Sequence, residues 1–248
     1  HIGLIKTSSS REKITDSAAG ATAFACGKKT YNGAISVSDD TTAIATLVER
    51  VSPRGIKTAV LATSSITHAT PACFYAHVYA RREQEAIAEF LVRSEVDFFA
   101  GGGWEFFAKR KDGLNYLDSL KMYGFGVDTS GLNPVEGKPA YLLAADGMPT
   151  MKQGRGDFLP QATGLALQEM TDAKAGFFIM VEGSQIDWGG HANDGNYIVT
   201  EMQDFDKTLG QVLDFAEKDG NTLVVVTADH ETGGFTLVSG KRGDIPSY

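Results

Sequence analysis

The sequence is short of the features that mark membrane, nucleic-acid-binding and disulfide-rich proteins. Its apolar runs, such as residues 177–181 and 223–226, are four or five residues long, whereas a helix needs about 20 apolar residues to cross a bilayer. Positive charge is also scarce, because 23 Lys and Arg residues face 31 Asp and Glu residues and leave a net charge of −8. We therefore expect no membrane span and no nucleic-acid-specific binding, and any phosphate group must be bound by local charges.

Cysteine is nearly absent, with only Cys26 and Cys73 in 248 residues. Each lies in an Ala-rich or apolar stretch, where a buried free thiol is the usual state, and neither has the spacing of a metal ligand. The sequence begins at His1 without an initiator Met and ends at Tyr248 soon after a strand-like run. We expect either a processed chain or a piece of a longer one, truncated at both ends.

What the sequence does contain is enough apolar residues, 42%, for a large core. Short β-branched or aromatic runs alternate with helix-length amphipathic segments, a pattern typical of α/β folds. The expected strands are residues 57–61, 96–99, 140–143, 177–181 and 222–227. The expected helices are residues 18–26, 41–51, 72–93, 114–123, 159–173 and 198–218. The pattern predicts a single α/β domain over residues 1–248, a three-layer sandwich with a central, largely parallel sheet flanked by helices on both faces.

Histidines and carboxylates follow three of the expected strands. His68 lies in an oxygen-rich segment after the first strand, Asp187 and His191 follow the fourth, and Asp229 and His230 follow the fifth. In parallel sheets, ligands gather beyond the carboxyl ends of the strands. Each group alone could be ordinary loop residues that cap helices and bind water, but together they predict a metal site, since His with carboxylate suits Zn²⁺ and extra oxygens suit Mg²⁺.

Ser17 is predicted at the start of the Ala-rich helix over residues 18–26. The simplest interpretation is that Ser17 caps the helix. A phosphoryl group carried on Ser17 would also be well placed, because the N–H groups and the dipole of a helix N-terminus stabilise an anion. The Gly-x-Ser-x-Gly motif of serine hydrolases is absent around Ser17, which favours activation by a metal.

Several blocks of the sequence, in a fixed order, carry a resemblance to a known family. They are TDSAAGATA, GKKTYNGAISV, THATPACFYAHVYAR, VEGSQIDWGGHAND and TADHETGG. From about Ile14 to Phe235, the chain resembles the alkaline phosphatases, metal-dependent phosphomonoesterases with an α/β fold. The resemblance implies two Zn²⁺ and one Mg²⁺ per active site, phosphate monoesters and inorganic phosphate as ligands, a periplasmic or extracellular location, and the homodimer common among relatives.

The same resemblance implies the residues of a zinc centre. Ser17 would be the nucleophile that accepts the phosphoryl group. Asp187 and His191 would bind one zinc ion, and Asp229 and His230 would bind the second, which coordinates Ser17. Because deprotonated oxygens held by zinc would be the reactive species, we expect activity to rise toward alkaline pH.

Further roles are implied for the magnesium and phosphate sites. Glu182 and Thr70 would belong to the magnesium site, with His68 nearby. Arg81 would bind two phosphate oxygens with its planar guanidinium; a register error of one residue would exchange it for Arg82, and a solvent-exposed helix residue is the alternative for either.

Two ligands of the family have no counterpart in this sequence. An Asp in an Asp-Gly-x-Gly segment would lie upstream of His1, and a further zinc-binding His would lie beyond Tyr248. A second hypothesis is therefore a catalytically weak or inactive core, in which each zinc ion keeps two protein side chains besides Ser17 or water, below the usual three. A third is a related phosphodiesterase or sulfatase-like hydrolase. Trp188 is expected either to shape phosphate affinity or only to pack.

Overall fold

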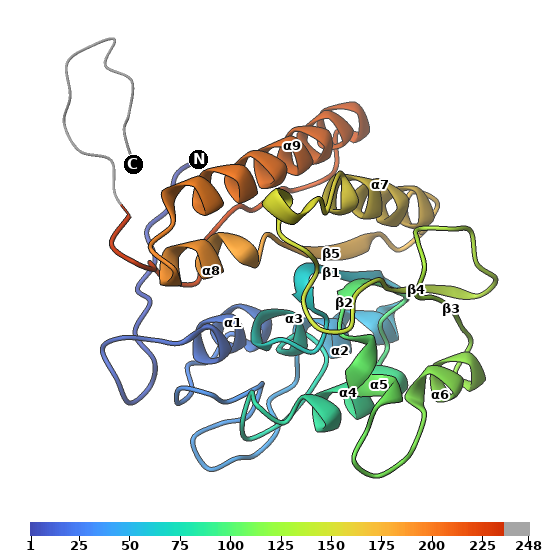
Figure 1. The fold of residues 1–248 in the computed structure, drawn as a ribbon, viewed down its shortest axis with the longest axis horizontal. Helices are drawn as coiled ribbons and strands as arrows, with labels where there is room; N and C mark the ends of the chain where they lie inside the picture. Colours follow the sequence, from blue (N-terminus) through green and yellow to red (C-terminus); the bar gives the residue numbers. More distant parts are fainter. Residues whose placement is uncertain (236–248) are drawn as a thin grey trace.

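The computed structural model describes residues 1–235 and shows a parallel sheet between two layers of helices (Figure 1). The sheet has the strand order β3-β4-β2-β1-β5, and every neighbouring pair is parallel. The strands are β1 (Lys57–Ser65), β2 (Phe98–Gly102), β3 (Phe125–Asp128), β4 (Lys138–Leu142) and β5 (Phe177–Glu182). The predicted three-layer α/β sandwich is confirmed.

Helices cover both faces of this sheet. The described α-helices are α1 (Ser17–Cys26), α2 (Leu47–Val51), α3 (Ala69–Ala72), α4 (Gln84–Arg93), α5 (Trp104–Ala108), α6 (Tyr116–Met122), α7 (Phe158–Met170), α8 (Gln185–His191) and α9 (Gly195–Asp219). Two short 3₁₀ turns, η1 (Ser52–Arg54) and η2 (Met151–Gln153), follow α2 and precede α7. In Figure 1, α7 and α9 lie above the sheet, α8 lies beside the end of β5, and α1 to α6 lie below the sheet.

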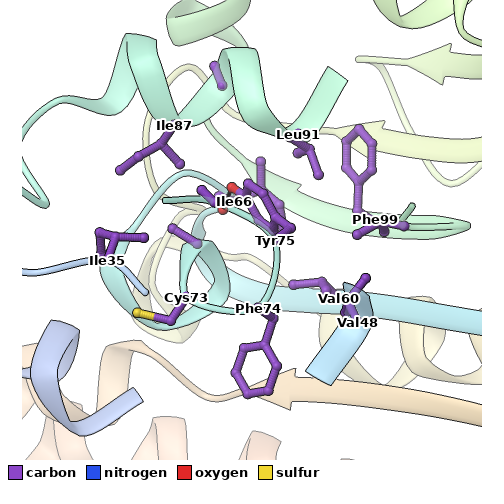
Figure 2. Packing of buried hydrophobic residues seen from close by; sticks show 14 of the residues in the cluster. Ile35, Val48, Val60, Ile66, Cys73, Phe74, Tyr75, Ile87, Leu91 and Phe99 are labelled. Carbon is purple, nitrogen blue, oxygen red and sulfur yellow. Dashed lines mark hydrogen bonds between the residues drawn. The ribbon is translucent and has the colours of Figure 1, made fainter. Parts of the chain in front are cut away.

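The period-2 alternation of strand side chains divides the core into two clusters. Leu61 of β1 packs in the cluster that contains Leu159 of α7, while its neighbour Val60 belongs to the opposite cluster. Figure 2 shows that second cluster, in which Ile87 and Leu91 of α4 pack over the sheet. Because β1 is buried on both faces, its apolar run of sequence is continuous rather than alternating.

Two expected helices are shorter than the sequence pattern predicts. The expected helix over 72–93 is wrong as one element, since α3 and α4 are separated by an irregular segment. Within that segment, Val78 pairs with Ile35 as an antiparallel bridge, and the N–H of Arg81 donates to the carbonyl of Gly33. The backbone groups that would continue the helix are thus bonded to another segment. The expected helix over 41–51 begins only at α2, where Thr46 forms a capping box.

Two strand predictions also differ from the structure. Residues 222–227 form no strand, and Leu223 and Val225 are 86% and 75% exposed. Their β-branched residues favour an extended conformation, but a strand needs a hydrogen-bonded neighbour, and no described strand pairs with this segment. Conversely, β3 was missed because Gly124 and Gly126 on either side of Phe125 are typical of a turn.

The described residues contain two free thiols and a set of helices that can be checked for membrane-spanning character. Cys26 and Cys73 are both buried and free, as expected. Burial raises the pKa of the Cys73 thiol to about 12, so the thiol stays protonated. Among helices of residues 1–235, none combines the length and the apolar character that a bilayer crossing requires.

Candidate active site

The N-terminus of α1 places Ser17 at the carboxyl edge of the sheet. Asp16, not Ser17, is the capping residue, and its Oδ1 accepts from the N–H of Ala19 at 3.0 Å. The interpretation of Ser17 as a cap is therefore wrong, because Ser17 is the first residue of the helix itself. Only 8% of Ser17 is exposed, and its Oγ lies 3.0 Å from Nε2 of His230. The Ser17 hydroxyl therefore faces His230 rather than capping the helix, since the carboxylate of Asp16 does the capping.

Arg81 is held beside Ser17 by the same Asp16. Its Nη1 donates to Asp16 Oδ2 at 3.0 Å, and its Nη2 lies 3.4 Å from Nε2 of His68. Arg82 points elsewhere, because its side chain is 77% exposed and pairs with Glu83. The geometry thus favours Arg81 over Arg82 as the guanidinium that faces the site.

The segment after β5 supplies two carboxylates and a histidine. Glu182 ends β5, while Asp187 and His191 lie one turn apart on α8, with Asp187 Oδ2 3.5 Å from His191 Nε2. Ser184 donates to Glu182 at 2.7 Å. Burial raises the pKa of Glu182 to about 7, and the charge of Asp229 adds to the rise while the Ser184 hydrogen bond opposes it.

Thr70 and His68 approach this region from α3. The Thr70 hydroxyl hydrogen-bonds to Glu182. Burial, and after it the charge of Arg81, lower the pKa of His68 to about 4, so its imidazole is neutral near pH 7. His68 meets Trp188 edge-on, with ring centroids 5.7 Å apart, and its Nδ1 is buried without a hydrogen-bond partner in the part of the chain that the structure describes.

The C-terminal segment 228–235 brings Asp229 and His230 onto α1 and α8. Asp229 Oδ2 lies 3.4 Å from His230 Nε2. Asp229 can approach α1 because Gly20 has no side chain: a Cβ there would lie 3.1 Å from the Cβ of Asp229. Thr232 donates to Asp187 at 2.5 Å, which joins this segment to α8.

A cavity of about 460 Å³ lies where these elements meet. Its walls include six of the nine sequence-predicted site residues: Ser17, His68, Arg81, Asp187, His191 and His230. The other three, Thr70, Glu182 and Asp229, are not part of the wall, although Thr70 and Asp229 interact with Glu182. Trp188 also faces the cavity and packs so closely on Gly147 that a Cβ there would lie 2.6 Å from the indole.

The donor set fits divalent cations. Four carboxylates, those of Asp16, Glu182, Asp187 and Asp229, stand in this region against the single guanidinium of Arg81. The histidine and carboxylate ligands occur as two pairs, and within residues 1–235 no group of three such side chains is close enough to hold an ion by itself. Paired ligands and excess negative charge are what bound cations would complement.

Sequence reasoning missed two positions that the structure brings into the site. Asp16 both caps α1 and holds Arg81; an Asp directly before an Ala-rich helix is an N-cap signal that could have revealed the first role. Thr232 lies between Asp187 and His230. No sequence signal marks Thr232, because it is one of several polar residues after the fifth expected strand.

Comparison with known proteins identifies the family to which the sequence is similar. A family model described as alkaline phosphatase matches residues 1–244. Alkaline phosphatase 3 of Bacillus subtilis (strain 168) is 40% identical over 237 residues, which cover 91% of this chain and 51% of that protein. The chain thus spans about half the length of these curated relatives.

The solved structures that resemble this chain are also alkaline phosphatases. The alkaline phosphatase from the Antarctic bacterium TAB5 is 56% identical, with a TM-score of 0.93 and coverage of 97% of this chain and 72% of that one. A variant of that enzyme, solved with magnesium bound, is 57% identical at the same TM-score, with coverage of 95% of this chain and 69% of that one. This chain belongs to the alkaline phosphatase family.

Proposed function

We propose that this chain is the core of a metal-dependent phosphatase that hydrolyses phosphate monoesters through a phosphoserine intermediate on Ser17. The observation that carries the proposal is the placement of Ser17 as the first residue of α1, with its hydroxyl in a cavity that also contains Arg81 and His230. Relatives named as alkaline phosphatases support it.

Ser17 and Arg81 supply the nucleophile and the phosphate clamp. Free N–H groups in the first turn of α1 favour negative charge on a phosphoryl group bonded to Ser17 Oγ. Arg81 binds equatorial phosphate oxygens with the guanidinium N–H groups that do not pair with Asp16. Because Asp16 fixes the guanidinium before substrate arrives, little side-chain entropy is lost when the phosphate binds.

Three cation positions complete this proposal. Asp187 and His191 would bind one zinc ion, Asp229 and His230 the other, and Glu182 with Thr70 a magnesium ion near His68. Bound cations supply positive charge at the attacking, leaving and equatorial oxygens and lower the pKa of oxygens bound to them. Because each zinc ion would keep only two protein side chains besides Ser17 or water, below the usual three, the competing proposal is a core of weak activity.

The decisive experiment compares three esters on the same chain. We expect zinc-dependent hydrolysis of p-nitrophenyl phosphate, faster at alkaline pH, and much slower hydrolysis of bis(p-nitrophenyl) phosphate and p-nitrophenyl sulfate. Ser17→Ala should abolish turnover, while Ser119→Ala on α6 should not change it. A rate preference for the diester or the sulfate ester would instead favour the sulfatase-like alternative, and zinc binding without turnover would favour the weak core.

The proposal also covers the location and the oligomeric state of the protein. A phosphatase of this family, acting on small monoesters and releasing inorganic phosphate, is proposed to work in the periplasm or outside the cell and to form a homodimer. Sedimentation of the zinc-loaded chain tests the second point: a monomer at micromolar concentration would contradict it.

A further inference from the structure

A threonine hydroxyl connects residues from two separate parts of the site. Thr232 Oγ1 donates to Asp187 Oδ1 at 2.5 Å and lies 3.1 Å from Nδ1 of His230. Asp187 belongs to α8, whereas His230 belongs to the segment after α9. One side chain outside the predicted ligand set therefore contacts one member of each predicted zinc pair.

The polarity of these contacts follows from the groups involved. An ionised Asp187 can only accept, so the Thr232 hydroxyl hydrogen points to its Oδ1. The Thr232 oxygen is then an acceptor for His230 Nδ1. The carbonyl oxygen of Glu231 also lies 3.1 Å from Nδ1 and can only accept. With these two acceptors at 3.1 Å, we assign the hydrogen to Nδ1, so that Nε2, which lies 3.0 Å from Ser17 Oγ and 3.4 Å from Asp229 Oδ2, presents its lone pair to the cavity.

The contact also orients the carboxylate of Asp187. Oδ1 is taken by Thr232, which leaves Oδ2 facing Nε2 of His191 at 3.5 Å. The oxygen and the nitrogen that would share one cation thus lie on the same side of α8. Without the hydroxyl, the carboxylate could rotate about its terminal torsion, which has a broad energy minimum.

Close backbone packing holds Thr232 in place. A Cβ on Gly190 of α8 would lie 2.8 Å from the Thr232 carbonyl oxygen. Gly233 has φ of 78°, and a Cβ there would meet the Gly190 carbonyl oxygen at 2.2 Å. Only glycine at both positions lets the segment lie directly on α8, so the contact between Thr232 and Asp187 is part of the packing rather than a chance meeting of two surface side chains.

We propose that Thr232 is a positioning residue, which fixes Asp187 and His230 relative to each other for cation binding at both predicted zinc positions. The inference rests on the proposed function. Groups of this kind, hydrogen-bonded to metal ligands, change metal affinity or activity about 10–100-fold when they are removed.

The test compares Thr232→Val, which keeps the shape but removes the hydroxyl, with Thr232→Ser, which keeps the hydroxyl. Thr200→Val is the matched control, because within residues 1–235 the Thr200 hydroxyl donates only to carbonyls of its own helix, α9. Zinc affinity is measured by calorimetry on the metal-free chain, followed by kcat and KM for p-nitrophenyl phosphate. We expect zinc affinity to fall about tenfold or more in Thr232→Val, and kcat to fall by a larger factor than KM rises. In Thr232→Ser and Thr200→Val, we expect the zinc affinity to stay near that of the wild type.

Three results would overturn the proposal. Wild-type zinc affinity in Thr232→Val would show that the hydroxyl does not position the ligands. Equal losses in Thr232→Ser and Thr232→Val would assign the effect to packing. A wild-type chain that binds no zinc at millimolar concentration would overturn this inference and the proposed function together. Zinc binding without hydrolysis in the wild type would contradict the proposed activity alone, since the zinc affinities of the variants would still decide the role of Thr232.

Discussion

A buried charge cluster joins the loop before α7 to α9, and its removal is the perturbation whose effect the structure defines best. Arg155 donates from Nη2 to Glu201 at 2.5 Å and to Asp204 at 2.8 Å. The three side chains are only 0%, 2% and 1% exposed. Glu201 also accepts from the N–H of Met151, so the cluster connects η2 to the middle of α9. The proposed change is Arg155→Met, which keeps an unbranched side chain but removes the positive charge.

The expected cost follows from the charges left behind. Removing one partner of a buried ion pair costs about 3–5 kcal/mol, because the other charge stays buried without compensation. Here two carboxylates, Glu201 and Asp204, lose the same partner, so we expect about 5 kcal/mol. For a chain of this size each kcal/mol lowers Tm by about 2–4 °C, which gives a decrease of about 10–20 °C. Such a loss is a large fraction of the total stability of about 5–15 kcal/mol typical of globular proteins.

Thermal and urea unfolding, followed by circular dichroism, would measure this loss. Arg54→Met, at an exposed arginine of η1, is the control and should change stability by less than about 0.5 kcal/mol. A triple variant, Arg155→Met with Glu201→Gln and Asp204→Asn, should recover much of the stability, because no buried charge remains. If Arg155→Met lost less than about 1 kcal/mol, like an exposed ion pair, the cluster would not be the buried junction that the structure describes.

The remaining predictions concern the site and α9. Folding raises the pKa of Glu182 from 4.5 to about 7, so in the metal-free protein this group contributes a stability that falls as pH rises from about 4.5 to 7, whereas His68, whose pKa falls from 6.5 to about 4, contributes a slope of the opposite sign. Glu182→Gln should remove the first contribution, so its stability relative to wild type should increase with pH and exceed it by up to about 3 kcal/mol at pH 8 in urea titrations. Gly20→Ala should lower zinc-dependent turnover, since its Cβ would lie 3.1 Å from that of Asp229; unchanged turnover would contradict the close approach. Gly210→Ala, exposed within α9 with no atom within 4 Å of the new Cβ, should raise stability by about 1 kcal/mol without affecting turnover.

The sequence was informative where one local signal dominates. Hydrophobic period and flanking glycines placed α6, α7 and α9 within a few residues. The clearest case is α7, where Leu159, Ala162 and Ala166 form a buried apolar stripe. The rule that ligands lie beyond the carboxyl ends of parallel strands selected His68 and the residues of α8, and these line the cavity.

The failures have a common physical origin in contacts between distant segments. Helical periodicity continues through residues 72–93, but Val78 and Arg81 bond to Ile35 and Gly33, which lie some 45 residues earlier in the sequence, and the helix is interrupted there. The strand propensity of residues 222–227 is real, but propensity does not supply a pairing partner. The role of Thr232 depends on the meeting of two segments through Gly190 and Gly233, which no sequence window contains.

The candidate site therefore consists of two parts with different structural origins. Asp16 creates the first part locally: it caps α1, so the Ser17 hydroxyl has no capping role, and it anchors Arg81 with its second oxygen. The cation-binding part has no such local determinant, because Asp187 and His230 are brought together only when the segment after α9 packs on α8. Partial unfolding of that segment would leave the nucleophile and the arginine in place while separating the zinc pairs. On the proposed function, phosphate binding by Arg81 and catalysis by Ser17 are thus separable properties, and the packing of residues 228–235 controls the second.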